Sequence, residues 1–82
     1  MGNNNQKKVI RNLINDLNNK NKCAKAMNNL KELCWDDKKS IKNKKYSHKY
    51  QAIHCLVALL NAEVDFDLKD QALDLITYLA LF

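Results

Sequence analysis

The chain has 82 residues, a length that suits one domain with a core of limited size. It contains no proline and a single glycine, Gly2, which excludes a turn-rich strand protein and favours helices. The net charge of +5 is unevenly divided, because residues 1–49 carry +9 and residues 50–82 carry −4. A basic half and an acidic half can attract one another, within one chain or between copies.

The first two predicted helices cover residues 5–18 and 22–35. In both segments the apolar residues recur at helical spacing and form one stripe, with polar residues elsewhere on the helix. Residues 1–4 are polar, and we expect them to be disordered. Trp35 stands at the end of the second helix, where we interpret it as a half-buried structural residue. At an interface the same side chain would be an anchor.

A lysine-rich segment separates these helices from the second half of the chain. We predict a solvated basic loop over residues 36–46, because the like charges of its lysines repel one another. Ser47 suits the N-cap of a third helix over residues 47–62. This segment is apolar over most of its circumference, which is typical of a central, buried helix. Asp67 can cap a fourth helix over residues 67–81.

The fold class predicted from these segments is all-α, with one domain over residues 1–82. Four helices arranged as two stacked helical hairpins fit the pattern, and an up-and-down four-helix bundle is the alternative. The helix stripes predict a core of eleven large apolar side chains. These are Leu13, Leu17, Met27, Leu30, Leu33, Ile53, Leu56, Leu60, Leu73, Ile76 and Leu79.

The two halves of the chain align as an internal repeat. Val9–Leu17 matches Ala52–Leu60 at an offset of 43 residues, and Ala26–Cys34 matches Ala72–Ala80 at an offset of 46. The segments 69–80 and 30–34 resemble the closing helices of armadillo/HEAT repeats, whose period is about 40–47 residues. The glycine often found between armadillo helices is missing here. The resemblance implies a scaffold that binds peptides or proteins, without assigning a binding residue.

Candidate groups for catalysis or metal binding are few. Cys23, Cys34 and Cys55 lack the paired spacing of a zinc site, and their odd number favours reduced thiols in a cytoplasmic protein. Adjacent helical residues such as His54 and Cys55 diverge by about 100°, which is poor geometry for a dyad. We therefore predict no enzyme activity, no metal and no cofactor. No apolar run approaches the roughly 20 residues of a transmembrane segment.

The N-terminus partly resembles a motif for lipid attachment. Gly2 follows Met1 as in N-myristoylated proteins. Gln6, however, stands where that motif has Ser or Thr. We do not expect acylation.

The leading functional hypothesis is a protein-interaction module that self-associates or docks on a larger protein through its apolar C-terminal helix. Four short helices cannot easily cover all the apolar surface, and exposed apolar patches tend to mark contacts. The predicted partner-binding residues are Trp35, Tyr78, Leu81 and Phe82.

Two other functional hypotheses remain open. A basic nucleic-acid-binding domain would use lysines for phosphates and nearby aromatic rings for bases. A small immunity or anti-defence protein would fit the size and helicity alone. The residues predicted to contact nucleic acid are Lys38, Lys39, Lys42, Lys44, Lys45 and Lys49.

Overall fold

The protein is all-helical in a computed structural model, which confirms the predicted fold class. The structure describes residues 2–35 and 40–80, with the side chains of residues 5–35 and 40–80. The predicted number of four helices is wrong, because five are found in the described part of the chain. They are α1 (Gly2–Asp16), α2 (Cys23–Trp35), α3 (Ile41–Lys49), α4 (Ala52–Leu60) and α5 (Phe66–Ala80).

Helix α3 replaces most of the predicted basic loop. Three side-chain hydrogen bonds join it to α1, α2 and α5. Gln6 Nε2 of α1 donates to Asn43 Oδ1 at 2.9 Å, Asn43 Nδ2 donates to Leu33 O of α2 at 2.7 Å, and His48 Nε2 pairs with Leu79 O of α5 at 2.9 Å. Ser47, predicted as an N-cap, lies buried inside α3, and its hydroxyl donates to Asn43 O at 2.8 Å. Packing of one face of α3 therefore outweighs the charge repulsion along it, which solvent screens.

The predicted helix over residues 47–62 is broken at Gln51. This residue has φ 62° and ψ 41°, the left-handed region, and it turns the chain from α3 into α4. The backbone N–H of Gln51 donates to His48 O at 3.0 Å, which closes the last turn of α3. A residue with a Cβ atom in this region costs about 1–2 kcal/mol. Gln51 occupies the position where a glycine would be least strained.

Replacing Gln51 with glycine is expected to raise the free energy of unfolding by about 0.5–1 kcal/mol. The variant removes the left-handed strain of about 1–2 kcal/mol, and the greater entropy of glycine in the unfolded chain offsets part of the gain. Urea unfolding followed by circular dichroism measures the change. Asn61→Gly is the matched control, because Asn61 has φ −94° and carries no such strain. A loss of stability as large in Gln51→Gly as in this control would contradict the strain argument.

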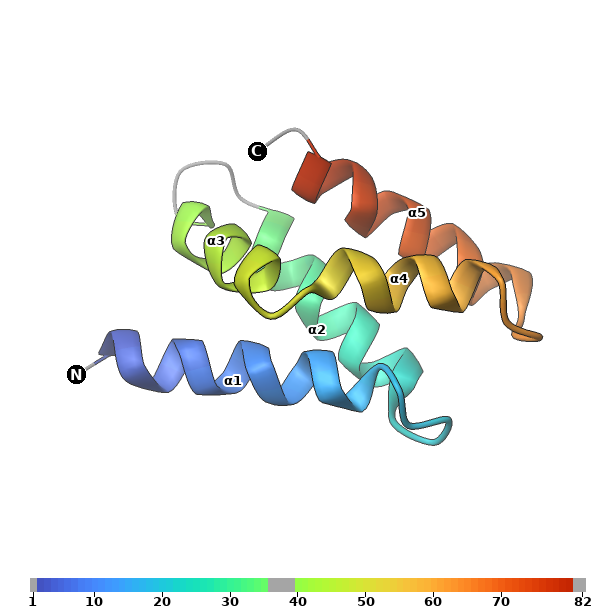
Figure 1. Ribbon diagram of the computed structural model, residues 1–82, viewed down its shortest axis with the longest axis horizontal. Coiled ribbons are helices and arrows are strands. Elements are labelled where there is room, and N and C mark those ends of the chain that lie inside the picture. Colours follow the sequence, from blue (N-terminus) through green and yellow to red (C-terminus); the bar gives the residue numbers. More distant parts are fainter. Residues whose placement is uncertain (1, 36–39, 81–82) are drawn as a thin grey trace.

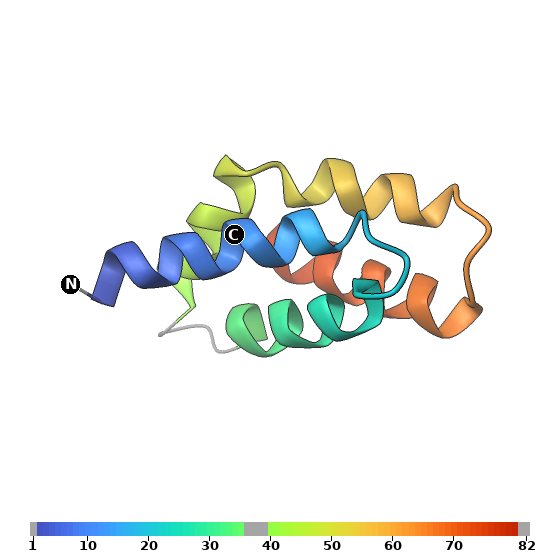
Figure 2. The same cartoon turned by 90° about the horizontal axis from the view of Figure 1, so that it is seen from below.

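Helix packing joins the two halves of the chain. Helix α2 contacts both α1 and α5, while α4 contacts α5 and α3 contacts the other four helices. Figure 1 shows α1 along one edge of the molecule and α5 along the opposite edge. Seen from below, α2 and α4 lie to either side of α1 (Figure 2). The inserted α3 distinguishes this arrangement from both predicted four-helix architectures.

The core agrees with most of the predicted list. Leu17, Met27, Leu30, Leu56 and Leu79 are buried. Five others are partly buried against them, namely Leu13, Leu33, Ile53, Leu60 and Ile76. The buried set also includes Ile10, Ile14, Cys23, Ala26, Cys34, Ala52, Ala72 and Leu75.

The assignment of Leu73 to the core is wrong, because its side chain is 50% exposed. Helix α5 has leucine on two faces, and Leu75 and Leu79, four residues apart, form the inward one.

Helix α4 is not the central buried helix that the sequence predicts, since Val57 is 44% exposed. Helix α5 begins at Phe66, so Asp65 and not Asp67 precedes its first turn.

Within the described residues, no helix combines the length and the hydrophobicity needed to cross a membrane.

Candidate functional site

Two of the predicted partner-binding residues meet on the surface. Trp35 at the end of α2 and Tyr78 near the end of α5 form an edge-to-face pair, with ring centroids 6.3 Å apart and an interplanar angle of 75°. Trp35 is 70% exposed, so the interpretation of a half-buried residue is wrong. A tryptophan this exposed in the free protein is available as an interface anchor. Leu81 and Phe82, the other two predicted residues, lie outside the described part of the chain.

A shallow groove of about 210 Å³ lies beside this aromatic pair and is also lined by Asn28, Lys31 and Glu32 of α2. Lys31 Nζ lies 3.4 Å from Asp74 Oδ2 and joins α2 to α5 at the same place. An exposed ion pair of this kind contributes at most about 1 kcal/mol to stability. Its main effect here is to place a lysine and a carboxylate next to the two rings.

The outer face of α5 continues from Tyr78 and carries both apolar and acidic side chains. Phe66 is 83% exposed and Leu73 is 50% exposed, and their spacing of seven residues puts them on one face of the helix. Asp70 and Asp74 are exposed close to them. We call this surface the α5 face. It comprises Phe66, Asp70, Leu73, Asp74 and Thr77, with Trp35 and Tyr78 at its border.

The predictions from the sequence do not include Phe66 and Leu73 as surface residues. The signal that identifies them is their seven-residue spacing, which is out of phase with the stripe of Ala72, Leu75 and Leu79. Both stripes are helical in period. Only the position of α5 against α2 and α4 decides which stripe is inside.

The predicted nucleic-acid-binding lysines are only partly available. Lys42, Lys45 and Lys49 are exposed on α3, whereas Lys44 is 7% exposed and lies against the core. Lys49 Nζ stands 5.8 Å from the centroid of the Tyr50 ring. Lys38 and Lys39 lie outside the described residues. The predicted basic segment is therefore helical where the structure describes it, and one of its lysines does not face solvent.

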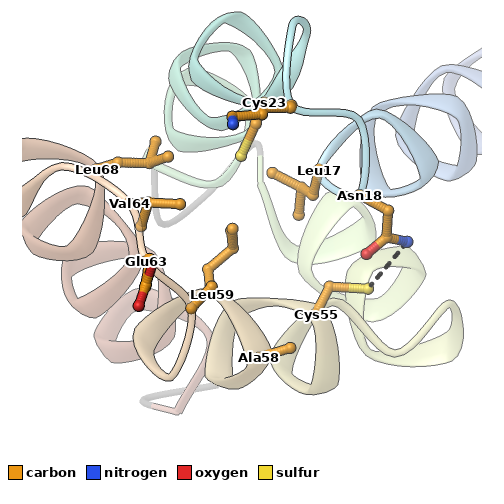
Figure 3. A pocket seen from close by; sticks show the side chains of 11 residues that line it. Leu17, Asn18, Cys23, Cys55, Ala58, Leu59, Glu63, Val64 and Leu68 are labelled. Atoms are coloured by element: carbon orange, nitrogen blue, oxygen red, sulfur yellow. Dashed lines mark hydrogen bonds between the residues drawn. The ribbon is translucent and has the colours of Figure 1, made fainter.

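A larger, mostly apolar pocket of about 380 Å³ lies where the α1–α2 and α4–α5 connections meet. Leu17, Leu59 and the Cys23 thiol point into it (Figure 3). Asn18 Nδ2 lies 4.0 Å from Cys55 Sγ across its wall. The polar groups at this pocket are few and of mixed charge, so they do not define a ligand. The remaining lining residues are Lys20, Ala58, Ala62, Glu63, Val64 and Leu68.

The three cysteines are free thiols. Burial raises the pKa of Cys23 and of Cys34. At Cys34 a contact of 3.6 Å with the Ser47 hydroxyl and the charge of Lys44 act in the opposite direction and are smaller. A raised pKa favours the neutral thiol, which is a poor nucleophile. The described side chains hold no group of three His, Cys, Asp or Glu residues that could bind a metal ion.

Comparison with known proteins adds no family to this description. Neither the family models, nor the curated proteins, nor the solved structures that were compared with the chain gave a match.

Proposed function

We propose that this chain is a non-enzymatic protein-interaction module that associates through the α5 face. The observation that carries the proposal is the exposure of three large apolar side chains on this face and at its border: Trp35, Phe66 and Leu73. Aromatic residues in such positions supply most of the binding energy in many interfaces.

The charge of the α5 face specifies the partner. Asp70 would oppose its own copy across a two-fold axis, and like charges brought together cost free energy. Asp74 contributes less to this repulsion, because it is paired with Lys31, and Lys69 places a cation beside the Phe66 ring. A partner with basic and apolar residues is favoured instead. A second copy offers such a surface, because residues 1–49 carry a net charge of +9. We therefore propose head-to-tail self-association, with a larger basic protein as the second candidate partner.

The Trp35→Ala variant is expected to weaken this association by about 30-fold or more, since truncating an anchor tryptophan costs about 2 kcal/mol or more. Trp35 is the only tryptophan, so its fluorescence reports the contact directly in the unmodified protein. Sedimentation from micromolar to millimolar concentration should show a mass rising above 9.5 kDa. Added salt should lower the association, because exposed charges contribute to it.

Two further variants distinguish association through the α5 face from association through exposed apolar residues elsewhere on the surface. Phe66→Ser with Leu73→Ser should leave a monomer at concentrations where the unmodified protein associates. Val57→Ser removes a similarly exposed side chain from α4 and should leave the association unchanged. A mass of 9.5 kDa at every concentration would rule out self-association. Equal effects of the α5 and α4 variants would rule out the α5 face.

A further inference from the structure

A second surface lies between α1 and the corner that joins α3 to α4. It is a groove of about 280 Å³ lined by four residues, of which three are cations: Lys7, Lys8, Arg11 and Tyr50. The sequence gives no hint that these residues are close, because Tyr50 is about forty residues from the others. Packing of α3 against α1 brings them together.

The groove is held by the same contacts that fix α3. The hydrogen bond from Gln6 Nε2 to Asn43 Oδ1 joins α1 to α3 one residue before Lys7. Lys7 and Arg11 are four residues apart, so they lie on one side of α1, with Lys8 next to them. Tyr50 ends α3, where its N–H donates to Tyr46 O at 3.0 Å just before the left-handed Gln51. The three cations and the Tyr50 ring, which is partly buried against the core, therefore lie on two elements of fixed relative position.

The positive charge of the groove is not balanced locally. Among the side chains that the structure describes, no carboxylate forms an ion pair with Lys7, Lys8 or Arg11. Asp16 is the one acidic residue of α1, and α3 has none. Lys49 adds a further cation beside the Tyr50 ring. A groove with several cations and no acid attracts an anion, and more strongly an anion with several charges.

We propose that this groove binds single-stranded nucleic acid, with the three cations on successive phosphates and Tyr50 as a stacking surface for a base. Lysine and arginine neutralise phosphates through charge-assisted hydrogen bonds, and each neutralised phosphate releases counterions. An aromatic ring beside a basic groove is the combination that single-strand-binding proteins use. Stacking on Tyr50 requires an unpaired base, so the groove favours single strands over duplexes.

A lipid surface fits this groove less well. A helix that lies on a membrane inserts its apolar face among the lipids. The inward residues Ile10 and Ile14 of α1, and Leu17 directly after it, are buried in the core of the protein. Helix α1 can therefore offer a membrane its charges but not its apolar stripe.

The test is fluorescence anisotropy with a labelled single-stranded oligouridylate, repeated over a range of salt concentrations. In the triple variant Lys7→Gln, Lys8→Gln, Arg11→Gln, the slope of log affinity against log salt should fall by about 2, since single strands lose about 0.7 per phosphate contact. The matched control is Lys20→Gln, Lys22→Gln, Lys25→Gln, which removes the same charge from the α1–α2 connection and the start of α2. The control should keep most of the slope.

The ring is tested separately from the charges. Tyr50→Leu should lower the affinity about 5-fold to 150-fold with the salt slope unchanged, because stacking contributes about 1–3 kcal/mol per base. Tyr50→Phe retains the ring and should bind like the unmodified protein. Phe66→Ser with Leu73→Ser, at the opposite edge of the molecule, should also bind normally (Figure 1). This last variant makes failure of the groove distinguishable from failure of the α5 face.

Several results would overturn the proposal. Equal losses of affinity and salt slope in the two triple variants would show that net charge alone attracts the oligonucleotide. Equal binding of duplex DNA with no effect of Tyr50→Leu would remove the single-strand assignment. Binding to vesicles of phosphatidylserine that depends on Lys7, Lys8 and Arg11, without oligouridylate binding, would assign the groove to lipid. Circular dichroism and urea unfolding of each variant establish that it is folded before its affinity is compared.

Discussion

Replacing Leu56 with alanine is expected to lower the free energy of unfolding by about 2–5 kcal/mol, the cost of deleting a fully buried leucine. Leu56 is 0% exposed and is one of two fully buried residues of α4. The removed methyl and methylene groups would leave a cavity, because the neighbouring helices cannot collapse completely around alanine. A domain of this size has a stability of only about 5 kcal/mol or somewhat more, so the variant should be largely unfolded at moderate urea concentrations.

Leu73→Ala on α5 is the matched control, since it deletes the same atoms from a side chain that is 50% exposed. Surface substitutions usually change stability by less than about 0.5 kcal/mol. Urea unfolding of both variants, at a concentration where the protein is monomeric, compares the two sites directly. A larger loss for Leu73→Ala than for Leu56→Ala would mean that the inward and outward stripes of α5 had been exchanged.

The apolar pattern of the sequence predicts the positions of α1, α2 and α5 to within a few residues. Helix α5 was expected over residues 67–81 and is found at Phe66–Ala80. Helix α2 was predicted over residues 22–35 and is found at Cys23–Trp35. Helix α1 was predicted over residues 5–18 and is found at Gly2–Asp16, so its boundaries differ by two or three residues. These elements depend mainly on local periodicity, which the sequence alone contains.

Helix α3 could not be predicted in the same way, because its stability depends on contacts with distant residues. Its buried residues are Lys44 and Ser47, and Ser40 is buried directly before it; none of the three is apolar. Their spacing of three to four residues is helical, but a count of hydrophobic residues does not detect it. Asn43 is bonded to Gln6 and Leu33, and neither partner can be identified without the tertiary structure.

The two candidate surfaces differ in how far the sequence anticipates them. Trp35 and Tyr78 were each predicted as partner-binding residues, but their contact follows only from the packing of α2 against α5. The groove of Lys7, Lys8 and Arg11 is not apparent from the sequence, because the lysines of residues 36–46 form a denser basic segment. In the structure three cations of α1 lie beside Tyr50, which directly follows the lysine-rich α3.

Alkylation of the native protein at neutral pH is expected to modify Cys55 first and Cys34 last. The rate at Cys34 should be lower than the rate at Cys55 by about a hundredfold or more. Cys34 is 0% exposed, whereas Cys55 is partly exposed beside a pocket. A buried thiol reacts only when the structure around it opens, and opening of a core helix costs about 3 kcal/mol or more in a stable domain. Iodoacetamide labelling followed by mass spectrometry of the peptides measures the three rates.

Protonation of the buried thiols lowers their alkylation rate, as their burial also does. Burial raises the pKa of Cys34 and of Cys23, and only the thiolate attacks the reagent. Cys23 should therefore react at an intermediate rate, because the residue is only 4% exposed but its thiol points into the pocket of Figure 3. In urea all three rates should become similar, which is the internal control for reagent preference. Equal rates for Cys34 and Cys55 in the folded protein would contradict the burial of Cys34 in the core.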